Sequence, residues 1–133
     1  MTTLISIERR GHVLLIGLNR PDKLNAFNPE MIRELAEAYT LLARDKSLRC
    51  GVLWAAGSDF TAGLDLPAIA RHVPKAVFKP FIPYGAVDPW GVRSAPCPKP
   101  LVTAVNGRCY TLGIELLLCN QITIAADNAS VSQ

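Results

Sequence analysis

The sequence predicts a single α/β domain in which short buried strands alternate with amphipathic helices. Three observations support this prediction. β-rich runs occur at residues 4–8, 13–19 and 51–56, an apolar stripe at helical spacing follows Asn28, and residues 99–127 have a strand–helix–strand pattern. The chain has 133 residues, the size of one ordinary domain, and 50% of them are hydrophobic.

The first two runs, Leu4–Glu8 and Val13–Asn19, are separated by a glycine-containing turn and are expected to pair as antiparallel strands. The second run barely alternates, so we expect it to be covered on both faces. A helix begins next, because Asn28 can cap the first amides and Pro29 suits the first helical position. Its apolar stripe consists of Met31, Ile32, Leu35, Ala38, Tyr39 and Leu42.

A third buried strand is predicted at Gly51–Ala56, and a short helix at Leu66–His72. The run at 99–127 is expected to form a parallel crossover on the same sheet. Residues 128–133 resemble the start of a further element.

Residues 74–100 hold seven of the ten prolines, so we expect them to be irregular. This stretch contains the aromatic residues Phe78, Phe81, Tyr84 and Trp90. They fit either the hydrophobic wall of a pocket or the underside of a docked loop.

Composition and charge exclude several classes. The net charge of +3 comes without a basic stripe, which argues against nucleic-acid binding. No run approaches the roughly 18 apolar residues of a membrane span, and the N-terminus does not resemble a signal peptide, so we expect a cytoplasmic protein. The cysteines (Cys50, Cys97, Cys109 and Cys119) show no CxxC pair, and with two histidines no zinc-ligand spacing occurs. We therefore expect packed, reduced cysteines and no metal site.

The segment GSDFTAGLDL, residues 57–66, is the first candidate for chemistry. It contains Gly57 and Gly63 and leads from a predicted strand to a predicted helix. Such a connection can leave backbone amides free to hold an anion or a developing oxyanion. The alternative is a purely structural loop.

Glu115 is the second candidate. It is the only glutamate in the second half of the chain, and it lies in a strongly apolar predicted helix. Desolvation there would raise its pKa toward the range of a general acid or base. The alternative is a glutamate in the first helical turn that faces water and is favoured by the helix dipole.

Three segments, NRPDKLNAF (19–27), GSDFTAGLDL (57–66) and the run at 99–127, resemble in order the signature segments of the enoyl-CoA hydratase/isomerase, or crotonase, superfamily. The resemblance implies a spiral of repeated β-β-α units, assembled as trimers or pairs of trimers. It also implies acyl-CoA thioester substrates, with no cofactor beyond the coenzyme A carried by the substrate. By the same resemblance, residues 1–133 are expected to form the N-terminal half of such a domain, before its C-terminal helical part.

The resemblance also implies roles for individual residues. Leu64 and Leu112 would supply the two backbone N–H groups of an oxyanion hole, and Glu115 falls on the first catalytic carboxylate. The residues that match substrate-binding positions are Lys23, Leu24, Ala26, Ala62, Gly63, Asp65, Leu66 and Gly113.

Two departures from the family pattern matter for the chemistry. The family's glycine triplet is Thr111-Leu112-Gly113 here, and a leucine at the donor position would crowd the thioester unless its side chain points away. The second catalytic glutamate of hydratases would lie beyond Gln133. The expected activity is hydration of a 2-enoyl-CoA; the alternatives are another reaction of the superfamily, such as isomerisation or hydrolysis, and a non-catalytic acyl-CoA-binding subunit.

Overall fold

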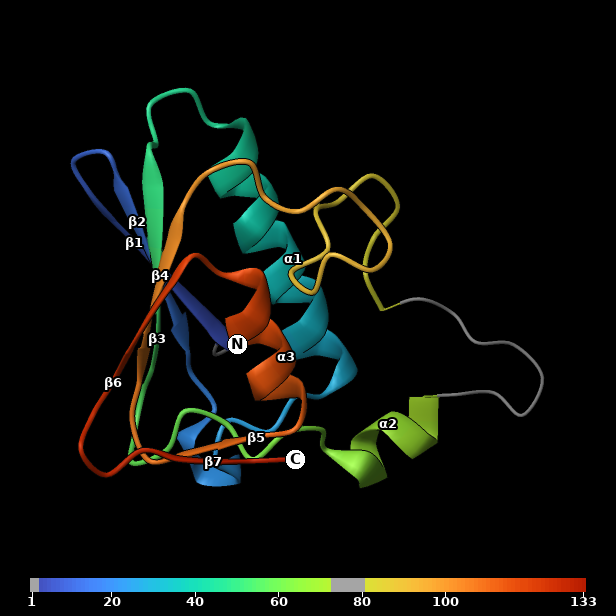
Figure 1. Cartoon of the computed structure of the whole chain (residues 1–133). Helices are drawn as coiled ribbons and strands as arrows, with labels where there is room; N and C mark the ends of the chain where they lie inside the picture. Colours follow the sequence, from blue (N-terminus) through green and yellow to red (C-terminus); the bar gives the residue numbers. More distant parts are fainter. Residues whose placement is uncertain (1–2, 73–80) are drawn as a thin grey trace.

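The computed structural model describes residues 3–72 and 81–133. Their main element is a mixed sheet with helices packed on one face (Figure 1). The strands are β1 (Ile5–Arg10), β2 (Val13–Leu18), β3 (Cys50–Ala55), β4 (Leu101–Val105), β5 (Arg108–Tyr110), β6 (Ile122–Ala125) and β7 (Ser130–Ser132). The helices are η1 (Pro21–Lys23), α1 (Pro29–Arg44), α2 (Leu66–His72) and α3 (Leu112–Cys119). The main sheet has the order β1-β2-β3-β4-β6, with only β1 antiparallel to its neighbour among these strands.

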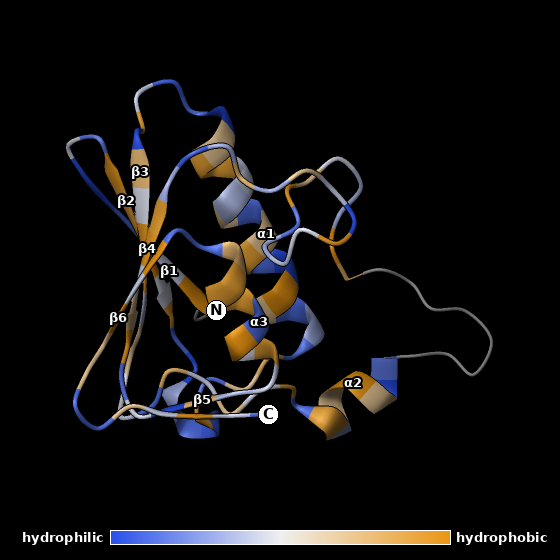
Figure 2. Ribbon diagram, in the orientation of Figure 1, coloured by the Kyte–Doolittle hydropathy of each residue, from blue (hydrophilic) through white to orange (hydrophobic). Residues whose placement is uncertain are grey.

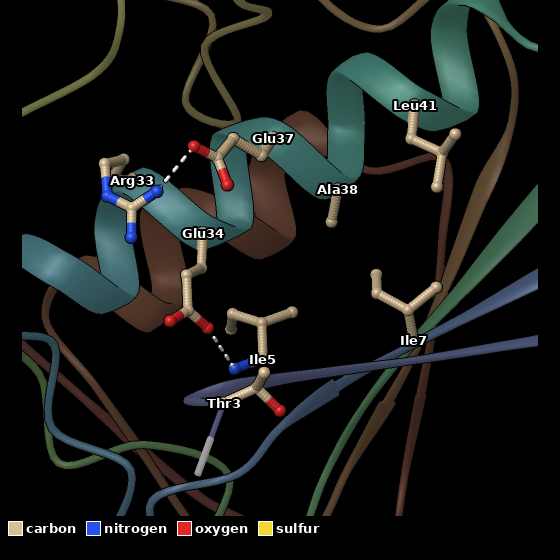
Figure 3. A pocket seen from close by; sticks show the side chains of 8 residues that line it. All are labelled: Thr3, Ile5, Ile7, Arg33, Glu34, Glu37, Ala38 and Leu41. Carbon is tan, nitrogen blue, oxygen red and sulfur yellow. Dashed lines mark hydrogen bonds and ion pairs between the residues drawn. The ribbon is translucent and has the colours of Figure 1, made fainter. Parts of the chain in front are cut away.

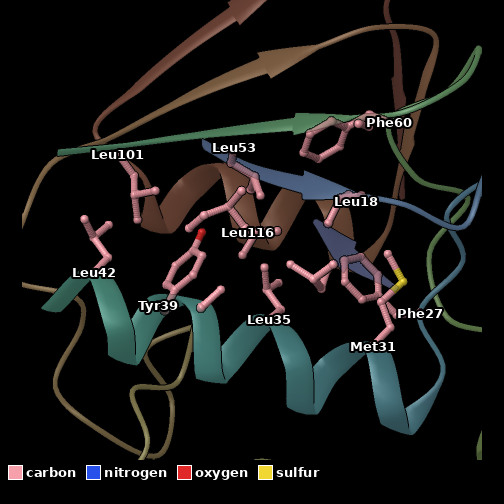
Figure 4. Packing of buried hydrophobic residues seen from close by; sticks show 14 of the residues in the cluster. Leu18, Phe27, Met31, Leu35, Tyr39, Leu42, Leu53, Phe60, Leu101 and Leu116 are labelled. Carbon is pink, nitrogen blue, oxygen red and sulfur yellow. The ribbon is translucent and has the colours of Figure 1, made fainter. Parts of the chain in front are cut away.

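The helix predicted after Asn28 is confirmed. The Asn28 side chain accepts a hydrogen bond from the Met31 amide at 2.8 Å, and Pro29 occupies the first helical position. The apolar face of α1 packs on the sheet together with α3, which contributes Leu116 (Figure 4). Fully buried members of this core include Leu14, Leu18, Phe27, Met31, Leu35, Leu42, Leu53, Phe60, Leu101 and Leu116.

The expectation that Val13–Asn19 is covered on both faces is wrong. Both helices lie on the same side of the sheet, so Val13 and Leu15 on the other side are only half-buried. Trp54 and Ile124 also lie on that side and are 38% and 63% exposed. The strands β2 and β4 are nevertheless largely apolar, as their colouring shows (Figure 2).

The parallel crossover from β4 through α3 to β6 is confirmed by the register of Val102 with Ile122. The sequence reading missed β5, which lies between β4 and α3. This strand pairs in parallel with β7, where residues 128–133 indicated a further element. The two strands form a small separate sheet near the N-terminal end of α3 (Figure 1).

Residues 81–100 contain no helix or strand, as expected from their prolines. The ring of Trp90 packs edge-to-face against Phe27 with centroids 5.6 Å apart, which supports the docked-loop alternative for this residue. Tyr84, in contrast, is fully exposed. The first part of the proline-rich stretch, including Phe78, lies outside the described residues.

All four cysteines are free thiols, and Cys109 is fully buried. Burial raises the pKa of the Cys109 thiol to about 11, so this group stays protonated at neutral pH. The other three cysteines are half-buried, so the packing expected from the sequence is confirmed. Within residues 3–72 and 81–133, no helix combines the length and the apolar character needed to cross a bilayer.

Candidate functional site

Two segments, residues 57–64 and 106–113, run side by side at the end of the sheet where β5 lies (Figure 1). Thr61 joins them through its backbone. Its N–H donates to the Arg108 carbonyl at 2.9 Å, and its carbonyl accepts from the Tyr110 N–H at 3.0 Å. This parallel pairing directs the ends of both segments toward the same place.

The two segments approach so closely that each carries a glycine against a threonine of the other. A Cβ on Gly63 would collide with the Thr111 hydroxyl, and a Cβ on Gly113 would meet Thr61 Cγ2 at 2.5 Å. Gly63 also has a φ of 98°, which a residue with a side chain rarely adopts. Both predicted glycine positions are therefore required for the contact between the segments.

The backbone amides of Leu64 and Leu112 lie at the converging ends, and neither donates a hydrogen bond to any described residue. The next amide along the first segment is paired, since Asp65 N donates to the Phe27 carbonyl at 2.9 Å. Leu112 is the first residue of α3, so its amide has no acceptor within the helix. The site thus presents two unpaired donors from two different segments.

The Leu112 side chain packs against the hydrophobic core, so it lies on the core side of its own peptide. Its carbonyl accepts a hydrogen bond from Trp90 Nε1 at 3.1 Å, which fixes the Leu112–Gly113 peptide group. The preceding peptide group, which carries the Leu112 N–H, is held by its own carbonyl, since the Thr111 oxygen accepts from the Ile114 amide at 2.9 Å. The side chain thus has the orientation that would avoid the crowding expected from a leucine at this position. Leu64 is 39% exposed.

Glu115 lies in the first turn of α3, and its side chain is exposed in this chain. Its amide donates a long hydrogen bond of 3.4 Å to the Thr111 carbonyl. The neighbouring residue Leu116, in contrast, is fully buried in the core. Of the two alternatives for Glu115, the water-facing one describes its environment here.

A groove of about 460 Å³ opens beside the exposed Leu64. It is lined by Arg20, Lys23, Ala26, Leu64, Asp65, Leu66, Pro67 and Arg71. Four of the eight substrate-binding positions predicted from the sequence, Lys23, Ala26, Asp65 and Leu66, therefore line one groove. Three cationic side chains face a single carboxylate in this groove, so its charge favours an anionic ligand.

Arg20 and Asp65 form a partly buried ion pair with a 2.8 Å separation of Nη1 and Oδ2. The Ala68 amide donates to Asp65 Oδ1 at 3.0 Å, and this hydrogen bond and the Arg20 side chain lower the pKa of the carboxyl. Asp65 therefore caps α2 and anchors Arg20, rather than standing free in the groove. The sequence reading missed Arg20, although it lies in the segment at 19–27, and it missed Arg71.

Asn25 links the loop at residues 19–27 to the segment at residues 57–64. It is fully buried at a φ of 52°, and its Nδ2 donates to the carbonyls of Ala56 at 2.8 Å and Asp59 at 2.9 Å. Beside it, the Ala62 amide donates to the Leu24 carbonyl at 2.9 Å. Leu24 and Ala62 thus join the two loops through their backbones and do not line the groove. The only sequence signal for the loop-linking role of Asn25 was the presence of two asparagines, Asn19 and Asn25, close to Pro21.

A second hollow, of about 340 Å³, lies between β1 and α1 (Figure 3). At its rim Glu34 accepts hydrogen bonds from the amides of Leu4 and Ile5, both at 2.8 Å. None of the predicted site residues lines this hollow. Glu34 thus provides hydrogen-bond acceptors for two backbone amides at the start of the edge strand β1, so its role there is structural.

Fold and site together define the class: an α/β protein whose converging loops present unpaired amides beside a cationic groove. A family model for enoyl-CoA hydratase/isomerase matches residues 8–133. The chain is 35% identical over 127 residues to the enoyl-CoA hydratase EchA19 of Mycobacterium tuberculosis, covering 92% of this chain and 46% of that protein. It is 38% identical over 132 residues to the 1,2-epoxyphenylacetyl-CoA isomerase of Escherichia coli, covering 97% and 49%.

The crystal structure of a probable enoyl-CoA hydratase/isomerase from Mycobacterium abscessus superimposes with a TM-score of 0.88 at 44% identity. The match covers 96% of this chain and 48% of that one. The chain therefore belongs to the enoyl-CoA hydratase/isomerase family and has the crotonase fold. It spans about half the length of the relatives that it matches.

Proposed function

We propose that this chain binds an acyl-CoA thioester and holds the thioester oxygen with the amides of Leu64 and Leu112. The observation that carries the proposal is that both N–H groups are unpaired at the meeting point of two segments. Reactions at the α and β carbons of a thioester pass through an enolate, whose oxygen such donors stabilise. Each donor of this kind contributes about 3 kcal/mol to transition-state stabilisation.

The groove beside Leu64 is proposed to receive the coenzyme A part of the substrate, with no further cofactor. Lys23 and Arg71 line it as cations, while Arg20 is engaged by Asp65. Phosphate groups of the ligand would pair with the side chains of Lys23 and Arg71. We also propose a trimer, or a pair of trimers, as the assembly.

The reaction that we propose is hydration of a 2-enoyl-CoA. Glu115 would orient the water and accept one of its protons as the water oxygen bonds to the β carbon, while the electrons of the C=C bond move toward the thioester oxygen to form the enolate. A proton would then add to the α carbon of the enolate, so that one water is added overall. The exposed position of Glu115, at the helix end that carries the Leu112 amide, supports this role. The second acid of a hydratase would have to come from outside residues 1–133.

Two other functions remain as defined alternatives. Isomerisation is favoured by the resemblance to the Escherichia coli 1,2-epoxyphenylacetyl-CoA isomerase. Non-catalytic acyl-CoA binding, or action as a subunit with a complementary chain, is the second alternative.

Mixing the chain with a short 2-enoyl-CoA separates these functions. Hydration removes the enoyl-thioester absorbance and adds one water to the product mass, whereas isomerisation leaves the mass unchanged. We expect Glu115→Gln to abolish hydration and the matched variant Glu37→Gln, on the exposed side of α1, to retain it. Calorimetric binding without turnover would support the non-catalytic alternative, and full hydration by Glu115→Gln would remove Glu115 from the mechanism. Native mass spectrometry measures the assembly.

A further inference from the structure

Thr111 has a backbone conformation that a β-branched residue rarely adopts, with φ of 46° and ψ of −108°. Such a conformation is strained, and it persists only where the surrounding structure imposes it. Thr111 also precedes α3 at the N-cap position, where a threonine hydroxyl normally accepts a hydrogen bond from a first-turn amide. Thr111 makes no such bond. Its hydroxyl therefore serves neither the helix nor the local backbone.

The Thr111 hydroxyl instead lies against Gly63, in the space that a side chain on that glycine would fill. The amide that follows Gly63 is the unpaired Leu64 N–H, and the amide that follows Thr111 is the unpaired Leu112 N–H. Thr111 is exposed, and its hydroxyl has no hydrogen-bond partner among residues 3–72 and 81–133. The hydroxyl thus lies against the residue that precedes one unpaired amide and belongs to the residue that precedes the other.

We propose that the Thr111 hydroxyl is a third hydrogen-bond donor to the thioester oxygen and to the enolate oxygen formed from it. This inference rests on the proposed function. A hydroxyl can rotate its proton toward an acceptor beside it, and hydrogen bonds to a charged oxygen are stronger than those between neutral groups. A glycine would relieve the strain at this position but would carry no donor. The presence of a threonine at this strained position is therefore explained by the bond that its hydroxyl makes to the ligand.

The test uses acetoacetyl-CoA, whose acidic α-carbon protons allow it to bind as an enolate that absorbs in the near ultraviolet. At a fixed pH, the absorbance gives the ratio of bound enolate to bound neutral ligand, independently of any turnover. Thr111→Val keeps the shape and removes the hydroxyl, and Thr111→Ser keeps the hydroxyl. We expect Thr111→Val to lower this ratio by about tenfold, while Thr111→Ser stays within about twofold of the wild type.

Thr111→Gly provides a second variant without the hydroxyl, in case the valine chain does not fold. We expect it to lose the enolate as Thr111→Val does, although it should unfold at a higher temperature because the strain is gone. A wild-type enolate ratio in either hydroxyl-free variant that binds the ligand would overturn the inference and leave the proposed function standing. Failure of the wild-type chain to bind acetoacetyl-CoA would overturn both.

Discussion

The Asp59 carboxylate receives three hydrogen bonds from Arg108. The Arg108 backbone N–H and Nε donate to Oδ1 at 2.9 and 2.8 Å, and Nη2 donates to Oδ2 at 3.3 Å. The Ser58 hydroxyl donates to the same carboxylate at 2.7 Å, and the Asp59 side chain is only 6% exposed. The pair therefore ties together the starts of the two segments whose ends present Leu64 and Leu112.

Asp59→Asn tests whether this pair fixes the spacing of the segments. The asparagine amide has the shape of the carboxylate. It places either an NH₂ group or an uncharged oxygen against the Arg108 and Ser58 groups that donate to the carboxylate in the wild type. We expect the free energy of unfolding to fall by about 1–3 kcal/mol, because charged hydrogen bonds to a buried group are lost. Urea unfolding measures the change. The matched variant Glu37→Gln breaks an exposed pair with Arg33 and should change stability by no more than about 0.5 kcal/mol. Equal effects of the two substitutions would contradict a special role for Asp59.

Acid should weaken the same contact. The Arg108 and Ser58 side chains lower the pKa of Asp59 from 3.8 to about 2. Because the folded-state pKa lies below the unfolded one, the contribution to stability is full above about pH 4 and is lost as the pH falls toward 2. We expect the stability difference between wild type and Asp59→Asn to shrink over this interval, as measured by urea unfolding at several pH values. A difference that stays constant down to pH 2 would exclude the carboxylate as its source.

Gly63→Ala tests the close approach of the two segments. An alanine at Gly63 meets the Thr111 hydroxyl and must also adopt a φ of 98°. At Gly85 the φ is 80°, but a Cβ has no atom within 4 Å, so Gly85→Ala measures the conformational strain alone. We expect Gly63→Ala to destabilise the chain by about 1–3 kcal/mol more than Gly85→Ala, as crowding in a packed region does. Thermal unfolding reports both values.

The double variant Gly63→Ala/Thr111→Gly distinguishes the collision from the strain. Removing the threonine side chain opens the space that the new Cβ needs, while the positive φ at position 63 remains. In the Thr111→Gly background, Gly63→Ala should therefore destabilise about as much as Gly85→Ala does in the wild type. If the penalty of Gly63→Ala is unchanged by Thr111→Gly, the two residues are not in contact in solution.

Much of the fold follows from local sequence features. The cap at Asn28 and the apolar stripe after it identify α1, and the β-rich runs locate β2 and β3 within one or two residues. β5 was missed because three residues are too few to show a period. The outer face was misjudged because apolar strands do not reveal whether a second layer covers them.

The site was less accessible to sequence reasoning. Backbone amides carry no side-chain signature, so Leu64 and Leu112 were located only through the resemblance to a family. The Asp59–Arg108 contact joins residues 49 positions apart and follows from the packing of two loops. The conformation of Thr111 could not be anticipated either, because threonine disfavours it locally and tertiary contacts impose it.

The cations of the groove give a prediction for ligand affinity. Lys23→Ala and Arg71→Ala should each weaken binding of a short acyl-CoA by about three- to tenfold, because each removes a charge that faces the groove. Added salt should reduce the difference from wild type, since these side chains are exposed. Calorimetric titration measures both effects, with Lys46→Ala, an exposed lysine outside the groove, as the control. Losses as large for Lys46→Ala would indicate a nonspecific charge effect instead.

The hydrogen bonds from the Leu64 and Leu112 amides to the thioester oxygen are tested most directly by the proton resonances of these two amides. In a ¹⁵N-labelled chain titrated with an acyl-CoA thioester, the amide protons of Leu64 and Leu112 should move downfield as they form hydrogen bonds to the thioester oxygen. Free coenzyme A, which lacks that oxygen, should perturb the groove around Lys23 and leave these two resonances nearly in place. Binding of the thioester without a downfield shift at Leu64 and Leu112 would contradict the claim.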